Sequence, residues 1–147
     1  MLRVDLYWSM RSPYCYLALD RVLGFVRDYE LTIDLRPVFP LAVRSDFFAR
    51  AHRNYRRYNL LDTKRIAAHL GIPFRRPIPD PIVQNLDTSE IAADQPYIFR
   101  LTRLAMAATM AGKGLAFVDH VTRMLWDGSV DNWHEGPHLA RAAARAG

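Results

Sequence analysis

Two side chains near the N-terminus could carry chemistry: the hydroxyl of Ser12 and the thiol of Cys15, which flank Pro13-Tyr14. The preceding residues 3–8 alternate in the manner of a strand with one buried face, and residues 13–29 have the apolar periodicity of a helix. Backbone N–H groups at the start of a helix lack partners and carry partial positive charge, so they stabilise an anion. This arrangement is typical of a site that handles a thiolate.

The single cysteine limits which thiol chemistry the chain can do. Exchange between a dithiol and a disulfide needs two cysteines, and Cys15 is the only one in the sequence. Ser12 supplies a hydroxyl donor, so an external thiolate, such as that of glutathione, could bind against it and the neighbouring N–H groups. The same residues also have a purely structural interpretation, with Ser12 as an N-cap and Cys15 as a small core residue.

The motif resembles that of the kappa-class glutathione transferases and 2-hydroxychromene-2-carboxylate isomerases, in the DsbA-like branch of the thioredoxin superfamily. In that group a Ser-Pro-x-Ser-Tyr-Leu-type motif follows the first strand, and its first serine faces the glutathione sulfur. Cys15 replaces the second, non-catalytic serine. The matching positions cover nearly all of the chain: Ser12, Pro13, Tyr14, Tyr16, Leu17 and Ala18; then Tyr58, Asp62, Arg65, Ala67, Gly71 and Pro73; then Gln95-Pro96-Tyr97, Leu104, Trp126, Trp133 and a helix from His138.

The resemblance implies a glutathione-dependent isomerase in which Ser12 is the catalytic residue. The family usually places an asparagine and a lysine in the region that corresponds to residues 44–76. Asn54 is the counterpart of the asparagine, and Tyr55 or Arg56 falls near the position of the lysine. An arginine there would still bind a carboxylate. The residues expected to bind glutathione are Ser12, Pro13, Tyr14, Asn54 and Arg56.

The substrate implied by the resemblance is a small aromatic-derived or unsaturated molecule. Glutathione thiolate would add to it reversibly. We expect Trp8 and Tyr14 to line an apolar pocket in which planar rings could stack.

The predicted elements define an α/β fold that begins as thioredoxin-like β-α-β. Two strands joined by one helix pair in parallel through a right-handed crossover. We expect residues 1–44 to form this portion, and residues 45–147 to form an inserted all-helical domain and the start of the return to the sheet. The predicted elements are strands at 3–8 and 31–38, helices at 13–29, 63–70 (with Asp62 as N-cap and Gly71 as terminator), 96–111, 115–126 and 138–146, and an extended proline-rich segment at 73–84.

Two parallel strands do not make an independent core. The C-terminal strands of the resembled fold are therefore expected to be missing from these residues. The chain would be a fragment, an ordered portion of a longer protein, or a protomer completed by a partner.

Two other functions stay open. Cys15 acting alone, or bound glutathione, could serve a DsbA-like thiol oxidoreductase or a transferase. The segment from Arg44 to Arg76 is rich in arginine and poor in carboxylates, with aromatic residues interleaved, so a non-catalytic module could bind nucleic acid there. A solvated helix face explains the same charges more simply, so nucleic acid is not an expected partner.

Composition favours a cytoplasmic protein. The chain has one cysteine, no apolar signal core and no apolar run of membrane-spanning length, so we expect no membrane partner. The five histidines lack metal-ligand spacing, and no metal is expected. A homodimer is open, since two-fold dimers are the commonest closed assembly.

Overall fold

Two parallel strands and the helix between them form the N-terminal part of the fold. The computed structural model describes residues 2–85, 87–88 and 90–147, and places β1 at Leu2–Trp8, α1 at Pro13–Asp28 and β2 at Leu31–Pro37. The strands pair in parallel, with Leu2 opposite Leu31 and Trp8 opposite Pro37. The predicted β-α-β opening is confirmed, and within the described residues the sheet has two strands.

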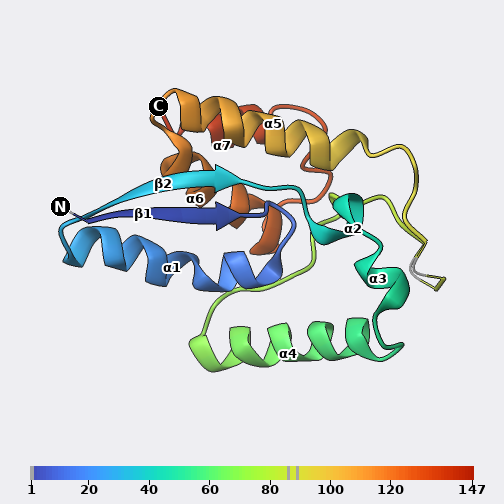
Figure 1. Cartoon of the computed structure of the whole chain (residues 1–147). Helices are drawn as coiled ribbons and strands as arrows, with labels where there is room; N and C mark the ends of the chain where they lie inside the picture. Colours follow the sequence, from blue (N-terminus) through green and yellow to red (C-terminus); the bar gives the residue numbers. More distant parts are fainter. Residues whose placement is uncertain (1, 86, 89) are drawn as a thin grey trace.

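In the described part of the chain six helices follow, and they lie on different sides of this unit (Figure 1). Helices α5 and α6 pack against β2, α6 also contacts α1, and α7 packs on α6. Helix α4 lies apart from these and contacts α1. The domain boundary expected at residue 44 stays a prediction. The bounds of the helices are α2 Leu41–Arg44, α3 Phe47–Arg50, α4 Tyr55–Leu70, α5 Pro96–Met110, α6 Gly114–Trp126 and α7 His138–Ala144.

The start predicted for α4 is wrong. The helix begins at Tyr55, and Asp62 lies in its middle instead of capping it. Its start was hidden because the helix buries only Thr63 and Ala67, so its first turns show no apolar periodicity. The predicted end is confirmed: Gly71 has φ 65°, a left-handed conformation that glycine adopts without steric cost, and its N–H caps the helix.

In the proline-rich segment between α4 and α5, bends at residues 78–79 and 81–82 interrupt the extended course predicted for residues 73–84. The backbone groups of this segment find partners elsewhere in the molecule, as buried backbone must. The Arg75 N–H donates to the Trp126 carbonyl at 2.7 Å, and the Pro79 carbonyl accepts from the Trp133 indole at 2.8 Å. The segment is therefore fastened to the helices it crosses.

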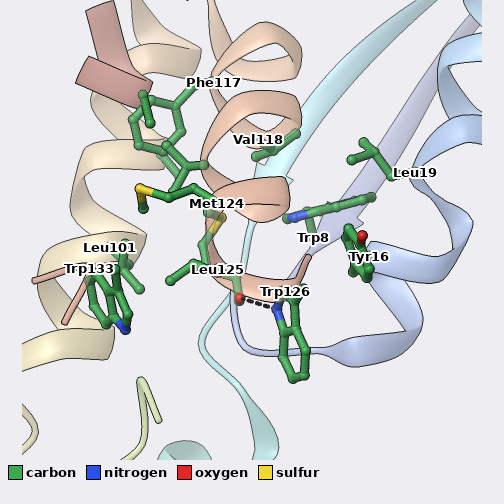
Figure 2. Close-up of a cluster of buried hydrophobic side chains, with 14 of the residues drawn as sticks. Trp8, Tyr16, Leu19, Leu101, Phe117, Val118, Met124, Leu125, Trp126 and Trp133 are labelled. Atoms are coloured by element: carbon green, nitrogen blue, oxygen red, sulfur yellow. Dashed lines mark hydrogen bonds between the residues drawn. The ribbon is translucent and has the colours of Figure 1, made fainter. Parts of the chain in front are cut away.

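The hydrophobic core is centred on α6 (Figure 2). Val118 and Val121 of this helix are fully buried, with relative exposure of 0%. Leu19 of α1 and Leu101 of α5 belong to the same cluster, so one core joins helices from both halves of the chain.

We expect Leu101→Ala to lower the free energy of unfolding by about 2–5 kcal/mol, because it deletes buried methyl groups and leaves a cavity. Met106→Ala in the same helix is the matched control, since Met106 is 43% exposed, and its effect should be below about 1 kcal/mol. Urea denaturation of both variants measures the difference. Equal effects would contradict the packing of α5 described here.

Candidate active site at the start of helix α1

Ser12 caps the first turn of α1. Its backbone is extended, and its Oγ accepts a hydrogen bond from the Cys15 N–H at 3.3 Å. Pro13 occupies the first helical position, where its fixed φ suits the helix and its missing N–H costs nothing. No residue in the described part of the chain accepts the hydroxyl hydrogen of Ser12. This hydroxyl can therefore donate to a bound anion while its oxygen holds the helix end.

Cys15 lies one turn into α1, behind Ser12. It is half-buried and packs against the hydrophobic core. Its backbone N–H is the group that Ser12 caps. The structure thus brings the two candidate side chains to one helix end and places the hydroxyl, not the thiol, at the tip.

Tyr14 joins α1 to α4. Its hydroxyl donates to the Asp62 carboxylate at 2.7 Å, and the Asn59 amide oxygen lies 3.4 Å away. Desolvation and the hydrogen bond to Asp62 raise the pKa of Tyr14, so the phenol stays protonated at neutral pH. Tyr14 as a whole residue is 39% exposed, and a ligand at the helix start could reach it.

Trp8 does not line an open pocket, which corrects the expectation for this residue. It is 2% exposed and lies in the core near Tyr16 and Leu19 (Figure 2). Trp8 is the last residue of β1, and its place in the alternation of the strand directs the indole inward. Its indole nitrogen has no hydrogen-bond partner among the described residues.

Asn54 and Arg56 lie at the start of α4 but in different surroundings. Asn54 is exposed, its side chain caps nothing in the described structure, and its backbone N–H donates to His52 Nδ1 at 3.2 Å. Arg56 is half-buried and donates to the Gln84 side-chain oxygen. Desolvation, followed by the nearby guanidiniums of Arg76 and Arg11, lowers the pKa of Arg56.

Those neighbours form a cluster around Asp80 that the sequence did not predict. Arg11 donates to both Asp80 oxygens, at 3.1 and 2.8 Å, and Arg76 donates to Oδ2 at 2.9 Å. The Asp80 side chain is only 13% exposed. Burial alone would raise the pKa of this carboxyl, but the two guanidiniums and the Ile82 N–H hold it below its usual value.

The Asp80 cluster adjoins the helix start through the chain itself. Arg11 directly precedes Ser12, and its guanidinium also lies 6.0 Å from the centre of the Trp126 ring. On its other side the cluster borders a hollow of about 490 Å³. The hollow is lined by Arg76, Asp80 and Gln84 and by the mainly apolar side chains of Pro77, Ile78, Pro79, Ile82, Val83 and Tyr97.

Most basic side chains between Arg44 and Arg76 are exposed, and three of the arginines pair with carboxylates. Arg50 pairs with Asp46, Arg75 with Asp131, and Arg76 with Asp80.

In the part of the chain that the structure describes, no helix is both long enough and apolar enough to span a membrane.

Comparison with solved structures relates this arrangement to a known fold. The chain is similar to 2-hydroxychromene-2-carboxylate isomerase, with a TM-score of 0.67 and 21% sequence identity. The similar region covers 99% of this chain and 66% of that one, so the chain spans just under two thirds of the length of that enzyme. No protein-family model and no curated protein matches the sequence.

This likeness shows the fold. Two parallel strands followed by helices match a thioredoxin-like architecture with a helical insertion. The expected fold class is thereby confirmed.

The electrostatics of Asp80 predict how stability changes with pH. The pKa of Asp80 is lower in the folded chain than the value of about 3.9 in an unfolded one, so its contribution is complete above pH ~4. That contribution is lost as the pH falls through the folded pKa. We expect Asp80→Asn to cost about 3 kcal/mol at neutral pH, because two guanidiniums lose their buried carboxylate.

The same variant should show a shallower loss of stability on acidification below pH ~4 than the unmodified chain. Asp131→Asn is the control, since its pair with Arg75 is exposed and worth less than about 1 kcal/mol. Denaturant titrations over an acidic pH series measure both. An Asp80→Asn profile parallel to that of the unmodified chain would contradict the assignment.

Proposed function

We propose that this chain uses glutathione in the isomerisation of a small aromatic-derived or unsaturated molecule. The observation that carries the proposal is Ser12. It caps a 16-residue helix shortly after β1, in a fold similar to that of 2-hydroxychromene-2-carboxylate isomerase, and its hydroxyl can donate to a sulfur. A serine at this place supports binding of an external thiol rather than exchange through a protein dithiol.

The donor set around the helix start fits glutathione. A thiolate is an anion, and the first turn of α1 offers partial positive charge together with the Ser12 hydroxyl. Glutathione also carries carboxylates, and Arg11, which directly precedes Ser12 in sequence, lies close to Arg56 and Arg76. Guanidinium forks bind carboxylates well. Thiol and carboxylate ends of one molecule therefore have matching groups here.

The residues of the chain would act on the ionisation of the thiol. Bound glutathione would supply a nucleophilic thiolate that adds to an electrophilic carbon of the substrate and leaves again, so that no atom is gained or lost. Ser12 donates its hydroxyl hydrogen toward the sulfur, and the helix end favours the charged form. Tyr14, two residues after Ser12, is kept protonated and is held by Asp62.

The similar solved enzyme is named for a hydroxychromene carboxylate. A substrate of that kind, with an apolar ring and a carboxylate, would suit the hollow of about 490 Å³, whose lining combines apolar side chains with Arg76. A reducing cytoplasm, where glutathione is abundant in its thiol form, is the location that this function needs.

The test is the ionisation of glutathione on the protein. We expect binding to lower the pKa of its thiol by about 1–2 units, as helix starts do for cysteine, measured from the ultraviolet absorbance of the thiolate. Ser12→Gly should lose most of this shift. Glycine is chosen because it costs an N-cap only a few tenths of a kcal/mol, so the fold is preserved.

Two controls sharpen the result. Ser12→Thr retains a hydroxyl and should keep the shift in thiol pKa. S-methylglutathione has no ionisable thiol, so calorimetric titration should give the same affinity for it in Ser12→Gly as in the unmodified chain. No saturable glutathione binding, or the same thiol pKa on the unmodified chain and on Ser12→Gly, would overturn the proposal.

A further inference from the structure

The Asp80 cluster gathers more positive charge than its carboxylate can balance. Arg11 and Arg76 share Asp80, and Arg56 reaches the same place through Gln84. These four charged residues thus carry an excess of two positive charges. The side chains of Arg11 and Arg76 are 25% and 31% exposed, so water screens their repulsion only in part.

The carboxylate of Asp80 is saturated with donors. Its Oδ1 accepts from Arg11 and from the Ile82 N–H at 2.9 Å, and its Oδ2 accepts from Arg11, from Arg76 and from Gln84 Nε2 at 3.3 Å. It has no capacity for a further guanidinium nitrogen. The excess positive charge of the arginines therefore has to be balanced by a group other than Asp80.

The guanidiniums still have N–H groups to offer. Arg11 and Arg76 use Nε and Nη2 on Asp80, and within the described residues their Nη1 groups have no acceptor. The adjoining hollow is lined by Arg76, Asp80 and Gln84, so a ligand in it can reach Arg76, and the side chain of Arg11 is itself 25% exposed. The Asp80 cluster therefore combines free guanidinium N–H donors on Arg11 and Arg76, excess positive charge and access from solvent.

We propose that Arg11, Arg56 and Arg76 bind a divalent oxyanion, with Asp80 and Gln84 as the residues that position the guanidiniums. A group with two negative charges and several acceptor oxygens matches both the excess charge and the forked donors. Sulfate is the simplest such ion. Any part that this site plays in turnover rests on the function proposed above, but the binding of the anion does not.

The experiment is calorimetric titration of sodium sulfate into the full chain, with sodium acetate and sodium chloride at matched ionic strength. Sulfate should bind saturably, and acetate at least tenfold more weakly. Arg76→Gln should weaken sulfate binding about 10–100-fold, the value of a charged hydrogen bond. Arg103→Gln, an exposed arginine on α5, is the control for net charge and should bind sulfate unchanged.

Folding is checked by circular dichroism, because Arg76→Gln also removes a contact to Asp80. Arg56→Gln is the second variant: Arg56 contacts Gln84, so its loss leaves the pairing of Arg11 and Arg76 with Asp80 in place. It should weaken sulfate binding at least fivefold in a folded chain. The proposal is overturned if sulfate does not bind or if all three anions bind with equal affinity. It is also overturned if Arg103→Gln loses as much affinity as Arg76→Gln. The cluster would then have only a structural role.

A glutathione titration in saturating sulfate identifies which oxyanion uses the site. Weaker glutathione binding would mean that its carboxylates occupy the cluster, and unchanged binding would mean that a separate anion does; both agree with the proposed site. Sulfate binding to Ser12→Gly should equal that of the unmodified chain. Failure of the thiol assay with sulfate binding intact would reject the glutathione function alone.

Discussion

The buried carboxylate of Asp80 is the constraint on which the candidate site depends. A carboxylate taken out of water costs several kcal/mol unless charges and hydrogen bonds compensate it. Arg11 and Arg76 provide the charges, and the Ile82 N–H provides a further donor. Because Arg11 precedes Ser12, the same compensation ties the irregular segment between α4 and α5 to the start of α1. If the segment and the helix start moved apart, the carboxylate of Asp80 would lose the guanidinium of Arg11.

Other contacts hold the helix start from different sides. The Tyr16 hydroxyl donates to the Pro73 carbonyl at 2.5 Å, and the ring of Phe74 stacks between Tyr16 and Trp126. The Trp126 indole in turn donates to the Met10 carbonyl at 3.4 Å, the bond drawn in Figure 2. Tyr14 binds α4 through Asp62, as described above. A site fixed by α4, α6 and the connecting segment can hold a ligand with little loss of chain entropy.

Local patterns predicted the parts of this molecule that local forces determine. The strand before Ser12, the proline at the first helical position and the glycine after α4 each have a local physical cause, and the structure confirms them. The buried face predicted for the strand is limited to its end, at Trp8. The start of α4 was missed because an exposed helix shows no apolar period. Trp8 was misplaced because an indole suits a pocket wall and a core equally well. Asp80 was missed because its partner Arg11 is 69 residues away in sequence, and no local pattern encodes that contact.

The start of α1 and the Asp80 cluster, which are joined through Arg11 and Ser12, supply positive potential from two different sources: a helix end and guanidinium groups. The helix end contributes partial charges that act over about one turn, whereas the guanidiniums carry whole charges in a half-buried setting where salt screens them less. A thiolate bound at Ser12 would be stabilised by the partial charges of the helix end, since it would lie against N–H groups and a hydroxyl. An oxyanion would be stabilised by the whole charges of the guanidiniums, since its oxygens match the forked guanidinium donors. In the function proposed above, serine suits position 12 because a cysteine there would itself become the thiolate at the helix end and would occupy the place of the external thiol.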